Sequence, residues 1–247
     1  GSDHPCKEHP LMLVGSATKK LVRLFPLSQL VTVMKVLYLL LTLHFFLFCK
    51  RENADQDKVT ADPRPAIVFL GDSLTAGRGV AESEAMPALI QKKLDEHKMA
   101  YRSVNAGRSG DTTAGGLARL DWYLDPETKM KALVIELGAN DAMRGQPVAE
   151  IEENLEQIIR KVRSHDPQIK IFLCQMHTFP NMGREYARDF SRLFARVARK
   201  EKVILLPFPL TGVGGVASLN QEDGIHPNAE GMQIFAANIW KGLQGHL

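Results

Sequence analysis

The sequence predicts an α/β fold, in which helices cover both faces of a mainly parallel sheet. Short apolar runs typical of buried strands alternate along the chain with segments whose apolar residues recur at helical spacing. Strands that alternate with helices of this length imply βαβ crossovers and therefore a parallel sheet. Polar motifs also follow several of these strands, and ligands of parallel sheets bind outside the carboxyl ends of the strands.

Five strands are expected, each a short apolar run bounded by polar or glycine-rich sequence. They cover residues 66–70, 101–104, 132–137, 169–176 and 203–206. Helices are expected over 85–97, 114–124, 147–164, a segment carrying Tyr186, Phe190 and Val197, and a final segment carrying Met232, Phe235 and Trp240. The helix over 147–164 has the clearest pattern, because its apolar residues recur every three or four positions between charged ones.

Length and composition suit one α/β domain with an appendage, since the chain has 247 residues, of which 45% are hydrophobic and 24% charged. The net charge of +3 comes largely from the first fifty residues, so nucleic-acid binding is not indicated. The three cysteines are far apart and build neither a disulfide framework nor a zinc site. Cys174 lies in an apolar run and is expected to be a buried thiol. No metal or other cofactor is expected.

The first 65 residues differ in composition from the rest, and the chain is therefore predicted to have three parts. Residues 1–49 form an N-terminal segment that ends in the apolar run 34–49, residues 50–65 form a charged tether, and residues 66–247 form the domain. The run is shorter than the roughly 20 residues of a membrane span but fits the apolar core of a secretion signal. We therefore expect an exported protein, periplasmic or associated with the cell envelope.

Cys49 at the end of this run is a candidate lipidation site, which would make the protein a lipoprotein. Such signals prefer a small residue before the cysteine, whereas Phe48 stands here. A plain signal peptide and an uncleaved membrane anchor over residues 34–49 therefore remain alternatives.

Ser73 is a candidate nucleophile because of where the first strand ends. The run 66–70 is followed by Gly71-Asp72-Ser73-Leu74, and a glycine here allows a tight turn that lifts the serine out of the sheet. A serine at a strand's carboxyl end, near a helix N-terminus that can bind an anion, suits nucleophilic catalysis. The alternative is a serine that only caps a helix or forms a turn.

The other polar motifs supply the remaining groups that acyl transfer needs. His226 can accept the proton of Ser73, and Asp223, three residues earlier, can bind the other imidazole nitrogen and fix its tautomer. The backbone N–H groups of Ser73 and Gly110 and the side-chain amide of Asn140 can form an oxyanion hole. These residues all follow strands, so the fold is expected to bring them together.

Four motifs in this order, Gly-Asp-Ser-Leu, Ser-Gly-Asp-Thr, Gly-x-Asn-Asp and Asp-x-x-His-Pro, resemble those of the SGNH (GDSL) hydrolase family. The family's four named residues match Ser73, Gly110, Asn140 and His226. The likeness covers about residues 64–245. Within the family, the chain is similar to the bacterial thioesterase I / protease I / lysophospholipase branch, also called arylesterases. It implies a flavodoxin-like, three-layer α/β/α fold with a five-stranded parallel sheet, no metal, and hydrolysis of carboxylic esters and thioesters.

The loop after the fourth strand is expected to contribute to substrate binding through His177, Phe179 and Met182, although apolar loop residues often only anchor a loop to the core. Asp141 is expected to be structural. The leading hypothesis is a monomeric serine esterase acting on a small acyl ester, thioester or lysophospholipid. An acyltransferase that uses the same site and a catalytically silent binding protein are the alternatives.

Overall fold

The structure is a computed structural model that describes residues 62–178 and 180–247. The predicted segment 1–49, with Cys49 and the apolar run 34–49, lies outside these residues, as do most of the tether and Phe179. The described end of the tether, residues 62–65, contacts the domain: the Nε of Arg102 donates to the backbone oxygen of Arg64 over 3.1 Å.

The sheet has five parallel strands in the order β2-β1-β3-β4-β5, which confirms the predicted fold class. The strands are β1 (Ala66–Gly71), β2 (Arg102–Gly107), β3 (Met130–Glu136), β4 (Lys170–Cys174) and β5 (Ile204–Leu206). Strand β1, which lies between β2 and β3, is buried along its whole length. A strand buried on both faces needs a continuous apolar run, and this is the pattern that β1 and β3 share.

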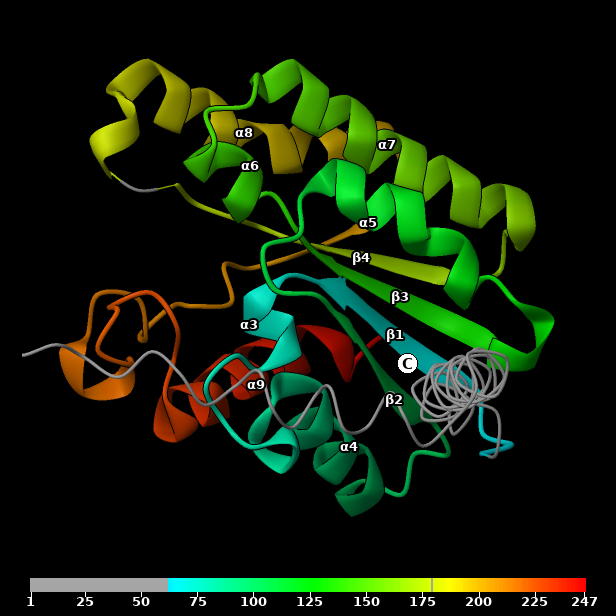
Figure 1. Cartoon of the computed structure of the whole chain (residues 1–247). Helices are drawn as coiled ribbons and strands as arrows, with labels where there is room; N and C mark the ends of the chain where they lie inside the picture. Colours follow the sequence, from blue (N-terminus) through cyan, green and yellow to red (C-terminus); the bar gives the residue numbers. More distant parts are fainter. Residues whose placement is uncertain (1–61, 179) are drawn as a thin grey trace, which may run out of the picture. The chain divides into compact units, whose positions relative to one another are not determined.

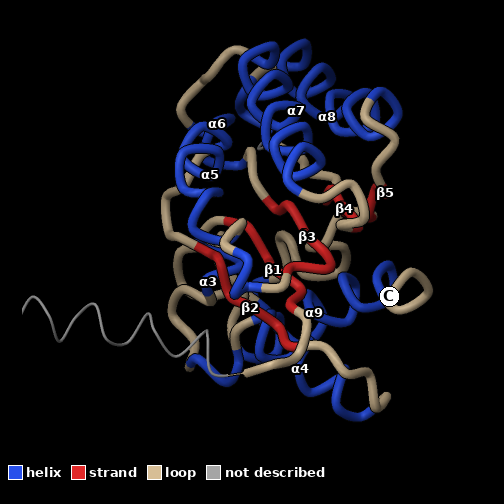
Figure 2. The backbone as a smooth tube through the Cα atoms, turned by 90° about the vertical axis from the view of Figure 1, so that its right-hand side faces the viewer, coloured by secondary structure: helices blue, strands red, loops and turns tan. Residues whose placement is uncertain are grey.

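Helices cover both faces of this sheet (Figure 1; Figure 2 gives a second view). They are α3 (Ser73–Ala76), α4 (Met86–Glu96), α5 (Thr113–Arg119), α6 (Ala139–Met143), α7 (Val148–His165), α8 (Arg184–Lys200) and α9 (Ala229–Leu243). Helix α4 packs against α9 on one face, and α7 packs against α5 and α8 on the other. Short 3₁₀ helices occur at η2 (Glu82–Glu84), η3 (Leu120–Tyr123), η4 (Pro126–Thr128), η5 (Pro180–Met182) and η6 (Ala217–Leu219).

The apolar faces predicted from periodicity are the buried ones. In α7, Ile151, Leu155 and Ile158 are fully buried, and in α8 the same holds for Phe190 and Leu193. Cys174 is a buried free thiol, as expected. Among the residues that the structure describes, no helix has the length and apolar character needed to cross a membrane.

Strand β2 continues to Gly107, whereas the sequence prediction ended it at residue 104. Two helices also differ from the prediction. The helix expected over 114–124 ends at Arg119 and continues as η3, whose tighter turn is closed by a hydrogen bond from the Leu124 N–H to the Asp121 oxygen. Helix α6 was not expected, because five residues are too few to show a helical period. It begins after Gly138, whose φ of 118° lies in the left-handed region that glycine adopts readily.

Candidate active site

The predicted motifs meet at the carboxyl ends of the strands. Ser73 begins α3 directly after β1, and Asn140 lies in α6 after β3. Gly110 lies in the loop between β2 and α5, and Asp223 and His226 lie in the loop before α9. All of these except Asp223 line one cavity. Residues separated by up to 153 positions in the sequence therefore form one site.

Ser73, His226 and Asp223 form a chain of hydrogen bonds. The Nε2 of His226 lies 2.8 Å from the Ser73 Oγ, and its Nδ1 lies 2.6 Å from the Asp223 Oδ2. An ionised carboxylate only accepts, so Nδ1 carries the proton and Nε2 is the acceptor that faces the serine hydroxyl. Ser73 and His226 are buried, whereas the Asp223 side chain is partly exposed. This is the arrangement that activates a serine.

Asp223 is held ionised by its own loop. The backbone N–H groups of His226 and Ile225 donate to Oδ1 over 3.0 and 2.9 Å. These two bonds, followed by the bond from the His226 ring, hold the pKa of Asp223 well below its usual range. Because the carboxylate stays charged, it can fix the orientation of His226 and stabilise the imidazolium without taking the proton itself.

The loop that carries His226 is anchored on both sides. The Gln221 N–H donates to the His226 oxygen over 2.8 Å, and Asn220 forms an antiparallel bridge with Pro227. Helix α9 begins at Ala229, with the Asn228 side chain accepting from the Gly231 N–H as its cap. The ring of His226 is therefore presented from an ordered turn just ahead of a capped helix.

The candidate oxyanion donors line the same cavity as Ser73. The Nδ2 of Asn140 donates one hydrogen to Asp72 Oδ2 over 3.0 Å, and an amide nitrogen has a second hydrogen to offer. Asp72 also accepts from the Leu74 N–H over 3.0 Å and so caps α3. Asp72 thus binds both the Asn140 side chain and the start of the helix that carries Ser73.

Gly110 has a φ of 80°, a left-handed conformation that favours glycine.

Two buried carboxyl groups lie behind the nucleophile, and sequence reasoning gave neither a role. Burial raises the pKa of Asp72 to about 6. Burial also raises the pKa of Glu136, the last residue of β3, well above its usual range, and its Oε2 accepts from the Thr75 Oγ1 over 2.7 Å. A charged residue directly after the apolar run 132–135 was the available signal for Glu136. Together with Thr75, Glu136 supports the turn that carries Ser73.

A second group of buried polar residues joins the Gly110 loop to the neighbouring elements. The Asp141 carboxylate accepts from the Thr113 Oγ1 over 2.6 Å and from the Thr113 N–H over 2.9 Å. The Nε of Arg119 donates to Asp111 over 2.6 Å, and its Nη2 donates to the Gly71 oxygen over 3.1 Å. Asp141 therefore has the structural contacts that were expected of it, to a backbone amide and a hydroxyl.

The cavity beside Ser73 has a volume of about 660 Å³ and largely apolar walls. Its apolar side chains include Met143, Met176, Phe208, Leu210 and Ile225. His177, a predicted substrate-binding residue, also lines it. Its ring packs edge-on against Phe208 with the ring centroids 4.5 Å apart, and its Nδ1 lies 3.2 Å from the Ser191 Oγ. Met182, which lies in η5, is not among the residues that line this cavity, in contrast to the prediction.

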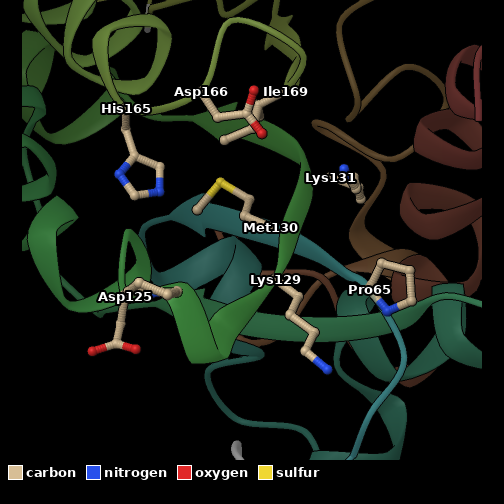
Figure 3. Close-up of a pocket in the computed structure, with 9 residues that line it drawn as sticks. Pro65, Asp125, Lys129, Met130, Lys131, His165, Asp166 and Ile169 are labelled. Carbon is tan, nitrogen blue, oxygen red and sulfur yellow. The ribbon is translucent and has the colours of Figure 1, made fainter.

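A second cavity, of about 390 Å³, lies at the opposite end of the sheet (Figure 3). Its walls include Pro65, Met130 and Ile169, which lie at or next to the amino ends of β1, β3 and β4. It holds none of the predicted site residues. Ligands of parallel sheets bind at the carboxyl ends, so the cavity at Ser73 is the candidate active site.

Asp72→Asn is expected to stabilise the chain relative to the parent as pH rises. The folded-state pKa of Asp72, about 6, lies above the ordinary aspartate pKa of 3.8, so the folded protein binds this proton more tightly than the unfolded chain does. The parent's stability therefore falls between about pH 4 and pH 6, where the unfolded carboxyl ionises first. Thermal unfolding from pH 4 to pH 8 should show the parent losing stability relative to Asp72→Asn. A difference that stays constant across this pH range would contradict the prediction.

One protein family and several known proteins match this chain. Residues 69–234 match the GDSL-like Lipase/Acylhydrolase family. The chain is 42% identical over 178 residues to Esterase TesA of Pseudomonas aeruginosa, and this match covers 72% of this chain and 87% of that protein. It is 36% identical over 178 residues to Thioesterase 1/protease 1/lysophospholipase L1 of Escherichia coli, with 72% of this chain and 83% of that protein covered.

The fold has the same relatives. A crystal structure of TesA matches with a TM-score of 0.70 and 42% sequence identity, and the match covers 74% of this chain and 99% of that one. The family match spans all four motifs, from the strand before Ser73 to the helix after His226. The chain therefore belongs to the GDSL-like lipase/acylhydrolase family, the SGNH hydrolases that its motifs resemble.

Proposed function

We propose that this chain hydrolyses carboxylic esters through an acyl-enzyme on Ser73. Its family and its relatives, which are named esterases and a thioesterase, make it an ester hydrolase. The observation that carries the residue assignment is the hydrogen-bonded chain from Ser73 through His226 to Asp223 at the edge of an apolar cavity.

In this mechanism the Ser73 Oγ attacks the ester carbonyl carbon while its proton passes to the Nε2 of His226. The charge that develops on the carbonyl oxygen is stabilised by the N–H groups of Ser73 and Gly110 and by the amide of Asn140. The imidazolium, stabilised by Asp223, then gives its proton to the leaving alcohol or thiol. Water, activated by the same imidazole, attacks the acyl-enzyme and releases the acid.

The substrate class follows from the cavity wall. Met176, Phe208 and Leu210 provide apolar surface next to a reacting serine, and this suits an acyl chain. The relative named thioesterase and lysophospholipase supports extending the proposal to thioesters and lysophospholipids.

Hydrolysis of p-nitrophenyl esters from acetate to palmitate by the full chain tests the proposal. We expect turnover with an optimum acyl length, because a cavity of finite volume accommodates only part of a long chain. A long-chain acyl thioester and a lysophospholipid test the wider substrate class. If a folded chain turns over none of these compounds, the esterase proposal fails. A second, transesterified product on addition of an alcohol would identify the acyltransferase alternative.

A further inference from the structure

Arg144 connects the two loops that carry the candidate oxyanion donors. It follows α6 directly, and its backbone N–H donates to the Asn140 oxygen over 3.2 Å. Its Nη2 donates to the Gly110 oxygen over 2.7 Å. A Cβ placed on Gly110 would lie 3.7 Å from that nitrogen, so the guanidinium lies beside the glycine's α-carbon. One residue therefore contacts both Asn140 and Gly110.

The segment around Gly110 is anchored on both sides, and Arg119 also binds Asp111, but Gly110 itself has a single hydrogen-bond partner among the described residues. The Arg108 N–H donates to the Gly71 oxygen over 3.0 Å, and Thr113 is bound to Asp141. Between these points, the Gly110 oxygen accepts only from Arg144, and no group within residues 62–178 and 180–247 accepts from its N–H. A free N–H next to a fixed carbonyl is what an oxyanion donor requires, since such donors act by being oriented in advance.

We infer that Arg144 is a positioning residue for the oxyanion hole. Its guanidinium fixes the Gly110 carbonyl, which belongs to the peptide that follows the glycine, and so restricts the backbone rotation at Gly110 that would turn its N–H away from the cavity and from Asn140. This inference rests on the proposed function of the site. Arg144 is exposed, so the contact orients a loop and contributes no core packing.

The kinetic consequence is specific. Loss of one oxyanion donor lowers kcat by about 10²–10³-fold, and a donor that is misplaced but still present should cost less. Arg144→Gln is therefore expected to lower kcat for p-nitrophenyl butyrate by roughly 10- to 100-fold and to leave KM within about twofold. Asn140→Ala sets the scale for full loss of a donor, and Arg188→Gln, an exposed arginine of α8 paired with Asp189, is the matched control.

Three further readouts separate positioning from other roles. The inhibition constant of an alkylboronic acid, which imitates the tetrahedral intermediate, should rise by about the same factor as kcat falls. The ratio of parent to Arg144→Gln kcat should persist between about 0.05 and 1 M NaCl, because salt screens an exposed charge but does not restore a lost orientation. The thermal unfolding midpoint should match that of Arg188→Gln.

Amide hydrogen exchange gives a readout that needs no turnover. Exchange in residues 108–113 should become faster in Arg144→Gln and stay unchanged in Arg188→Gln. If the parent shows no esterase activity, the proposed function fails, and exchange alone still decides whether Arg144 holds this loop. The inference is overturned if kcat and loop exchange match the parent, if the kcat ratio disappears in high salt, or if KM and unfolding change as much as kcat does.

Discussion

Ser73→Ala is expected to lower kcat for ester hydrolysis by about 10⁴-fold or more while the fold stays intact. The substitution removes the Oγ that lies 2.8 Å from the His226 Nε2, and no acyl-enzyme can form without it. The rest of the turn is retained, because Asp72 still caps α3 and Thr75 still binds Glu136. Steady-state hydrolysis of p-nitrophenyl butyrate measures the loss of kcat, and circular dichroism of both proteins checks that the fold is intact.

A matched control contacts a histidine that lines the same cavity. Ser191 also lies within hydrogen-bond distance of a histidine, 3.2 Å from the Nδ1 of His177, but the described residues show no carboxylate on that ring. Ser191→Ala should therefore keep most of the activity. An alkylphosphonate inhibitor should modify the peptide that contains Ser73 and not the one that contains Ser191. Full activity in Ser73→Ala, or modification at Ser191, would show that the nucleophile is assigned to the wrong serine.

His226→Ala is expected to have an effect of similar size, about 10⁴- to 10⁶-fold on kcat. The imidazole takes the proton of Ser73 and later protonates the leaving group, so its removal disables both steps of the reaction. Because the two residues act as one unit, the double variant Ser73→Ala/His226→Ala should be scarcely slower than either single variant. Independent, multiplicative losses would contradict the assignment.

The other histidine of the cavity is the matched control for His226. His177 lines the cavity, but within the described residues it makes no hydrogen bond to Ser73. His177→Ala should therefore keep most of the parent's kcat, in contrast to His226→Ala. A loss in His177→Ala as large as the loss in His226→Ala would move the general base to His177.

The sequence by itself determined the fold class, the positions of the five strands and the residues of the candidate triad. These properties are local: a buried strand needs a continuous apolar run, a covering helix needs one apolar face, and the turn at Gly71 needs a small residue. At Gly71 any Cβ would lie 2.1 Å from the Thr75 Oγ1. The parallel topology followed from the alternation of elements, and it placed the motif residues at one end of the sheet.

Only the tertiary structure decided which side chains meet there. The bond from Asn140 to Asp72, the contact of Glu136 with Thr75, and the bond from Arg144 to Gly110 join residues 34 to 68 positions apart. Met182 shows the same limit. It follows β4 in the same loop as His177, but only His177 lines the cavity. Strand register and helix packing fix such distances, and neither can be read from the spacing of residues along the chain.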